Sequence, residues 1–168
     1  MNRIAEKGGD NMCNCGCNSL SPRIVTTNRP AYGYVFNFPT QTVASGGNVN
    51  FSGNGPLVNI SHTPGTAAIL IPRAGDYLVE YTIAVDGPQM SAYALILNGV
   101  EVPNSATRYG ATSPAGTNQT LTGSAIISVP ANSTLLLRNV GNTADTLIGT
   151  DDGQGVLNAS LSIHRLGA

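Results

Sequence analysis

The stretch that decides the fold is Ile69-Leu-Ile-Pro-Arg-Ala-Gly-Asp-Tyr-Leu-Val-Glu-Tyr-Thr-Ile-Ala-Val85. It predicts a short buried strand, a turn that contains a proline and a glycine, and a long β-strand over residues 76–85. Every second residue of the long strand, from Tyr77 to Val85, is apolar, so one face of it should pack into a core. Leu78 and Ala84 add apolar surface to the opposite face. We therefore expect this strand to be covered on both sides.

From Ala31 to the last residue, the chain repeats the same alternation of apolar and polar residues. Asn98-Gly99 between two apolar runs is a strong hairpin signal, and no segment has the period of a helix. The strands that we expect besides 76–85 cover residues 32–38, 48–52, 57–61, 67–71, 91–97, 119–129, 134–140, 146–148 and 156–166. The sequence thus predicts an all-β fold, a two-sheet antiparallel sandwich or jelly roll with about ten strands.

The composition limits the classes of partner. Only 10% of the 168 residues are charged and the net charge is −1, whereas soluble domains carry about 25% charged residues. There is no electrostatic reason to bind nucleic acid or an anionic membrane, and no stretch is long enough to span a membrane. Residues 1–10 lack the apolar run of a secretory signal peptide. A surface rich in Asn, Ser, Thr and Gly favours a protein that is packed in an assembly or lies outside the cell. A merely polar globular domain remains the alternative.

Four segments carry a family resemblance: residues 71–81 (IPRAGDYLVEY), 95–103 (LILNGVEVP), 135–140 (LLLRNV) and 158–166 (NASLSIHRL). In this order and spacing they resemble the C-terminal domain of the Bacillus collagen-like glycoprotein of the exosporium. That domain is a jelly roll of the complement and tumour-necrosis-factor (TNF-like) type. The resemblance covers roughly residues 31–168, without the Gly-X-Y stalk that members of the family usually carry before this domain.

The resemblance implies a TNF-like jelly roll that forms homotrimers on the surface of bacterial spores. It also implies assembly from inside the mother cell, which would need no secretory signal peptide. Two regions follow: an irregular N-terminal connector arm over residues 1–30 and a jelly-roll trimerisation domain over residues 31–168. In a trimer built on the second face of the long strands, we expect these residues at the interface: Leu78, Thr82, Ala84, Ser160 and Ser162.

The arm contains Cys13-Asn-Cys15-Gly-Cys17. In an extended chain, alternate residues point the same way, so all three thiols can face one partner. Their Cα atoms are then about 7 Å apart, the upper limit for a disulfide within the motif. Three thiols per chain also leave one unpaired after any internal bond. We expect intermolecular disulfides, which anchor the arm to a neighbour. Free thiols on a disordered tail and a metal site are the alternatives, although a structural zinc site needs four ligands.

Other candidate sites are weaker. Asp151-Asp152-Gly153 has paired carboxylates that would suit calcium, but a solvated turn is the better interpretation because further acidic ligands are missing. His62 and His164 lack a neighbouring nucleophile or carboxylate cluster in the sequence, so we expect satisfied surface or interface histidines. We find no phosphate-binding loop and no nucleophile elbow. We therefore expect no catalytic residues, no enzyme activity, no metal and no cofactor.

The sequence thus predicts a structural, self-assembling subunit of a spore-surface layer or appendage fibre. The arm would dock to, or form disulfides with, neighbouring copies or other spore-surface proteins, as in the connectors of endospore appendage subunits, which it resembles in general character. Whether the chain is a repeating fibre subunit or a basal or tip component stays open. The alternative is an adhesin or lectin-like head that uses the polar loop 110–118, with Tyr109 as its aromatic platform.

Overall fold

A computed structural model of the chain describes residues 29–87, 90–102, 107–112, 114 and 117–167. Within these residues the secondary structure consists of fifteen strands, without a helix, and every strand pair is antiparallel. The all-β prediction is therefore confirmed. The same part of the chain contains no helix with the length and hydropathy needed to cross a membrane. The predicted arm, with its three cysteines, lies outside the described residues apart from Arg29 and Pro30.

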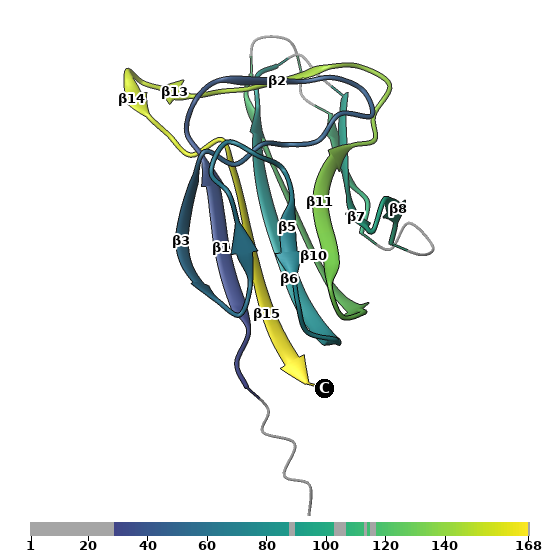
Figure 1. Cartoon of the computed structure of the whole chain (residues 1–168). Helices are drawn as coiled ribbons and strands as arrows, with labels where there is room; N and C mark the ends of the chain where they lie inside the picture. Colours follow the sequence, from purple (N-terminus) through teal and green to yellow (C-terminus); the bar gives the residue numbers. More distant parts are fainter. Residues whose placement is uncertain (1–28, 88–89, 103–106, 113, 115–116, 168) are drawn as a thin grey trace, which may run out of the picture.

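Two large sheets form the body of the molecule, and a two-stranded hairpin projects from one end (Figure 1). The larger sheet has seven strands in the order β2-β12-β6-β15-β1-β3, with β10 also paired to β6. Its strands are β1 (Tyr32–Asn37), β2 (Gln41–Val43), β3 (Gly53–Val58), β6 (Gly75–Val85), β10 (Gln119–Val129), β12 (Asp145–Leu147) and β15 (Ala159–Gly167).

The smaller sheet has six strands in the order β4-β5-β11-β7-β8, with β9 also paired to β7. Its strands are β4 (Ser61–His62), β5 (Ile69–Ile71), β7 (Met90–Leu97), β8 (Val100–Glu101), β9 (Tyr109–Thr112) and β11 (Ser133–Asn139). The hairpin consists of β13 (Thr150–Asp151) and β14 (Gln154–Gly155).

The stretch over residues 69–85 connects the two sheets. β5 belongs to the smaller sheet and β6 to the larger one, so the chain crosses from one layer to the other at residues 72–74. Ile69 and Ile71 are buried, and β6 pairs along its length with β10 and β15. The predicted short strand, turn and long strand are all present, and β6 is the centre of the larger sheet.

The core lies between the two sheets, as in other aligned sandwiches. One face of β6 is buried from Tyr77 to Val85, as the alternation predicts. Tyr81 brings a polar group into the core, and its hydroxyl donates to the backbone oxygens of Tyr93 and Thr107, each at 3.0 Å. The largest fully buried side chains are Tyr77, Tyr93, Phe51, Ile69, Ile71, Ile83, Leu95, Ile96, Leu135, Leu137, Leu147 and Leu161.

The structure differs from the sequence prediction at several short strands. The prediction placed a strand at 57–61, but β3 begins at Gly53. A side chain at Gly53 would collide with the ring of Phe36, and a Cβ at Gly55 would lie 2.8 Å from Tyr34 Cδ1. The two glycines, which resemble turn residues in the sequence, thus allow aromatic rings of β1 to lie over β3. β2 was not predicted either, because three residues show no clear period.

The two ends of the long strands differ in what they carry (Figure 1). At the arm end, where the described chain begins, the amide of Arg165 donates to Ala31 O at 2.8 Å, so β1 starts where β15 finishes. At the opposite end, here called the far end, Asp86 N donates to Thr146 O at 2.8 Å. The hairpin of β13 and β14 also lies at the far end (Figure 1).

Candidate functional site

The side of the larger sheet that faces away from the core is the main candidate surface, and we call it the uncovered face. On β6 and β15 it consists of the residues that alternate with the buried ones. The register places Ser160 beside Thr82 and Ser162 beside Glu80. All five residues predicted at the interface lie on this face and are half-buried: Leu78, Thr82, Ala84, Ser160 and Ser162. The structure thus brings them together, and their role as an interface stays a prediction.

One side of the uncovered face is aromatic. The alternation in residues 32–38 places Tyr34, Phe36 and Phe38 on one side of the chain, and the structure turns that side outward. Tyr34 and Phe36 have ring centroids 5.8 Å apart, and Phe36 and Phe38 meet edge to face at 5.6 Å. Phe38 is 47% exposed. Aromatic residues on an open sheet face are typical of a surface that another protein covers.

The other side of the uncovered face is aliphatic and ends in an open edge. Leu78 of β6 lies directly beside Ile126 of β10, and Ile126 is 66% exposed. Within the described residues β10 pairs with β6 alone, so one edge of this eleven-residue strand lacks a neighbour in its own sheet. β9 contacts this edge through Tyr109, whose hydroxyl donates to Ser124 O. The rest of the edge, beside the exposed Ile126, lacks a paired strand and is of the kind that proteins usually cover.

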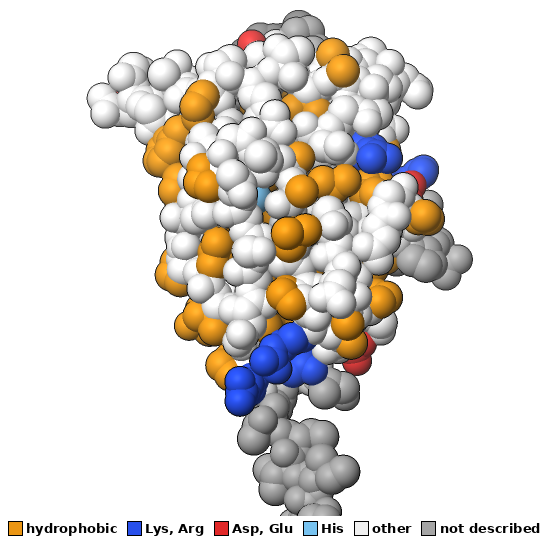
Figure 2. Space-filling view, viewed as in Figure 1, with side chains coloured by type: hydrophobic (Ala, Val, Ile, Leu, Met, Phe, Trp, Pro, Cys, Tyr) orange, Lys and Arg blue, Asp and Glu red, His pale blue; other side chains and the backbone are white. Residues whose placement is uncertain are grey.

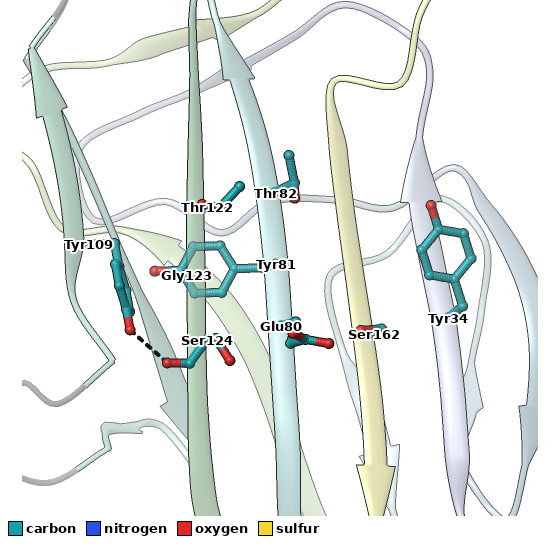
Figure 3. Close-up of a pocket in the computed structure, with 9 residues that line it drawn as sticks. All are labelled: Tyr34, Glu80, Tyr81, Thr82, Tyr109, Thr122, Gly123, Ser124 and Ser162. Carbon is teal, nitrogen blue, oxygen red and sulfur yellow. Dashed lines mark hydrogen bonds between the residues drawn. The ribbon is translucent and has the colours of Figure 1, made fainter.

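A hollow of about 480 Å³ lies on the uncovered face between these two sides (Figure 3). Nine residues line it: Tyr34, Glu80, Tyr81, Thr82, Tyr109, Thr122, Gly123, Ser124 and Ser162. The lining offers three aromatic rings, several hydroxyl groups and one carboxylate, that of Glu80. Such a surface can pack against a neighbour and form hydrogen bonds, whereas it lacks the paired nucleophile and base of acyl transfer.

Tyr109, the predicted aromatic platform, contributes to the hollow but is held in place. Its hydroxyl donates to Ser124 O at 2.7 Å, and its ring stands edge-on to Tyr81 with centroids 6.1 Å apart. Burial, with the nearby Tyr109 phenol, raises the pKa of Tyr81. The expected loop 110–118 is a further correction, because β9 reaches Thr112 and pairs with β7. Through its hydrogen bond to Ser124, Tyr109 therefore links β9 to β10.

The other predicted sites are dispersed. Cys13, Cys15 and Cys17 lie outside the described residues. Asp151 and Asp152 lie on the β13–β14 hairpin, and Asp152 adopts a φ of 48° in its turn. Within the described residues no three metal-ligating side chains gather.

The two histidines have different environments. His62 is 8% exposed. Its Nδ1 lies 2.6 Å from Asn54 Oδ1 and its Nε2 lies 2.9 Å from Thr66 O, so both nitrogens face acceptors. His164 is exposed on the uncovered face beside Leu78.

The sequence analysis missed a buried polar pair between the sheets. Asp145 of β12 and Tyr93 of β7 are both fully buried, and neither the carboxyl oxygens nor the phenol oxygen forms a hydrogen bond. Burial raises the pKa of Asp145, and the nearby hydroxyls of Tyr93 and Ser91 lower it in part. Burial and the neighbouring Asp145 also raise the pKa of Tyr93. An acid between Ala144 and Thr146 gives no sign of burial in the sequence.

Comparison with known protein families gives a match over nearly all of the described chain. The model of the BclA C-terminal domain matches residues 33–167. The chain belongs to the BclA C-terminal domain family. This confirms the resemblance found in the sequence, and it agrees with the segments at 71–81, 95–103, 135–140 and 158–166. A comparison with curated protein sequences finds no match.

Solved structures confirm the jelly roll as the fold of this family member. The globular domain of zebrafish complement 1qA has a TM-score of 0.59 at 9% identity, covering 80% of this chain and 94% of that domain. Eiger TNF from S. frugiperda has a TM-score of 0.61 at 12% identity, covering 82% of this chain and 92% of that one. Murine APRIL gives 0.54 at 7% identity, covering 82% of this chain and 100% of that one.

Proposed function

We propose that the chain is a structural subunit of a bacterial spore surface and that it assembles as a homotrimer through the uncovered face. The observation that carries this proposal is the exposure of aromatic and aliphatic side chains along one side of the larger sheet, which ends in the open edge of β10. Burial of a side chain such as Ile126 stabilises an association by about 1.5–3 kcal/mol. Membership of the BclA C-terminal domain family supports a trimerising structural role at the spore surface.

The uncovered face offers two unlike sides that can contact each other in a closed ring. The aromatic side on β1 and the aliphatic side on β6 and β10 are chemically different, so one side of each copy can pack against the other side of the next copy. A contact between unlike surfaces closes into a ring when the rotation allows it. In the trimer, Leu78 and Ile126 of one copy would pack against the aromatic rings of the next. Thr82, Ala84, Ser160 and Ser162 would line the rest of the contact with small side chains.

The arm supplies the second part of the proposal. Cys13, Cys15 and Cys17 would join trimers to each other or to further spore-surface proteins through disulfides. Nine thiols in a trimer cannot all pair within it, so at least one is left for a bond outside the trimer. The chain would then be a building block of a surface layer or appendage fibre.

The adhesin alternative finds less support. Tyr109 is 38% exposed, but its hydroxyl is bonded to Ser124 O and its ring stands edge-on to Tyr81. These contacts give the exposed ring a structural role between β9 and β10. The hollow beside it also belongs to the face that the trimer would bury. Trimer assembly and ligand binding at this position would compete.

The test is the native mass of the full chain with reductant present, measured by light scattering. The unmodified chain should have three times the mass of one chain, and Leu78→Asp should yield monomers because three carboxylates would be buried in the trimer. Ile126→Asp should act in the same way. Leu70→Asp is the matched control, since Leu70 is 49% exposed on the smaller sheet. A trimer that survives the first two substitutions would place the interface elsewhere.

A further inference from the structure

Three arginines gather at the arm end of the molecule, where Figure 2 shows the largest group of basic side chains. Arg29 is exposed. The Tyr77 hydroxyl donates to Arg73 O at 3.0 Å, and Arg165 is the register partner of Tyr77 between β15 and β6. Burial raises the pKa of Tyr77, and the positive charges of the two arginines lower it in part. The guanidinium of Arg165 donates through Nε and Nη2 to Ala74 O, at 3.1 and 2.8 Å. These contacts keep a positive charge at the turn between β5 and β6.

The acidic side chain near these arginines, Asp76, forms a hydrogen bond within the chain. Asp76, at the start of β6, accepts a hydrogen bond of 2.6 Å from Ser128 Oγ. Among the described residues it is the one carboxylate next to this turn in the sequence, against three arginines. Among the described residues at the arm end, the positive side chains therefore outnumber the negative ones.

The far end carries the opposite charge. Asp86 follows the end of β6 and is exposed, and its backbone is held by Thr146 O. Asp151 and Asp152 are exposed on the hairpin that projects at the same end (Figure 1). Arg138 also lies toward the far end, with its Nε bonded to Asn48 Oδ1 at 2.9 Å, so the three carboxylates there outnumber one guanidinium. Three exposed carboxylates thus stand about one β6 length away from the three arginines.

We propose that trimers stack end to end, with the arginines of the arm end of one trimer against the carboxylates of the far end of the next. The inference rests on the proposed trimer and names the partner of its two ends as a second copy. Neither end belongs to the uncovered face, so both stay accessible after the trimer forms. If the threefold axis runs along the strands, the three arm ends of a trimer lie at one end of the axis and the three far ends at the other. The arm ends of one trimer can then contact the far ends of the next around the same axis.

The charge arrangement also makes the stack directional. Two arm ends repel each other, as do two far ends, so unlike ends meet. Single exposed ion pairs are weak, but a trimer forms several at once, and simultaneous contacts raise the overall affinity without new chemistry. The contact should therefore be reversible and sensitive to salt, because the screening length falls from about 30 Å at 0.01 M salt to about 3 Å at 1 M.

The test uses the full chain with reductant, so that disulfides of the arm do not hold trimers together. Sedimentation velocity and negative-stain microscopy should show stacked trimers at low salt and single trimers at about 1 M salt. Arg29→Glu with Arg73→Glu reverses the arm end, and Asp86→Arg with Asp151→Arg reverses the far end. Each double variant should stop at the trimer. A one-to-one mixture of the two should stack again, since every contact then joins opposite charges.

Glu101→Lys is the matched control, since Glu101 lies on the flank in an ion pair with Arg108 at 2.6 Å. It changes the net charge by two without touching either end, and it should stack like the unmodified chain. Stacks that persist at high salt or in both double variants, or a mixture that stays at the trimer, would overturn the inference. Loss of stacking in the arm-end variant alone would point to a different acidic partner and would also overturn it.

These outcomes separate the two proposals. A single trimer at every salt concentration contradicts the stacking and leaves the proposed trimer intact. A monomer mass for the unmodified chain contradicts the trimer, and the stacking of trimers with it.

Discussion

The outer faces of the two sheets have the same strand alternation but different surroundings. On β7 of the smaller sheet, Ala94 and Ile96 alternate with the core residues and so lie on the outer face. Their side chains are nevertheless buried, at 0% and 2% exposure. They pair with Arg138 and Leu136 of β11 within a surface that this chain itself covers. On the outer face of the larger sheet, by contrast, Ile126 of β10 is 66% exposed. Alternation therefore decides which residues share a face, and the rest of the molecule decides whether that face meets solvent.

The larger sheet is also the one built from long strands. β6 and β10 have eleven residues each, whereas β4 and β8 of the smaller sheet have two. A long strand presents a wide surface, and short edge strands limit unwanted pairing. The outer face of the larger sheet is therefore better suited to contact another copy than that of the smaller sheet.

We expect the largest effect on stability from a substitution on the core side of β15, compared with one on its outer side. Leu161→Ala removes a side chain that is 1% exposed and should lower the free energy of unfolding by about 2–5 kcal/mol, because it leaves a cavity between the sheets. Ser162→Ala, one residue away on the uncovered face, should change it by less than about 0.5 kcal/mol. Urea unfolding of both variants in a Leu78→Asp background measures the isolated chain. Equal effects would mean that β15 is not anchored as the structure shows.

A smaller effect should come from the contact between the sheets at Asp145. Because burial raises its pKa, the folded chain holds this proton more tightly than the unfolded chain. The stability that the proton contributes is present at low pH and is lost as the pH rises through the raised pKa. Asp145→Asn should therefore stabilise the chain at pH 8 by about 1–3 kcal/mol relative to the unmodified protein, with a smaller difference at pH 4.

Urea unfolding at the two pH values measures this change, and Asp151→Asn is the control that removes an exposed carboxylate at the same end. A gain that is as large at pH 4 as at pH 8 would contradict a buried, proton-dependent Asp145. It would leave a packing effect as the cause.

The smallest effect should be at Tyr109 on the rim of the hollow. Tyr109→Phe removes the hydrogen bond to Ser124 O and should cost about 0.5–1.5 kcal/mol of stability. Tyr32→Phe removes a hydroxyl from a tyrosine of equal exposure, 38%, on β1 and serves as the control. The pair is compared by thermal unfolding. If Tyr109→Phe unfolds like the control, β9 is not fastened through this bond.

The long strands could be predicted because apolar and polar residues alternate along them, so that each residue is assigned to the core face or the outer face. Tyr77 to Val85 and Ala159 to Ile163 alternate without exception between core and surface. β3 and β9 could not be predicted in the same way, since Gly53, Gly55 and Gly110 have no side chain that shows a side. Their place depends on rings contributed by distant strands, such as Phe36 over Gly53.

The candidate surface was predictable in part. Leu78, Thr82, Ala84, Ser160 and Ser162 share a face because their strands pair in register, and the sequence periodicity anticipated each strand separately. The outward side of the aromatic residues of β1 was not decided by the sequence, because an aromatic side of a strand is usually a buried one. The structure assigns the core side to Val35 and Asn37 instead.

The sequence by itself determined the fold class, the long strands and the family, because alternation and turn residues are local properties that each segment carries alone. Only the tertiary structure decided which side of the larger sheet stays open, how Asp145 meets Tyr93, and that arginines and carboxylates collect at opposite ends. These features join residues far apart in the chain, so they depend on how the sheets pack and on no single segment.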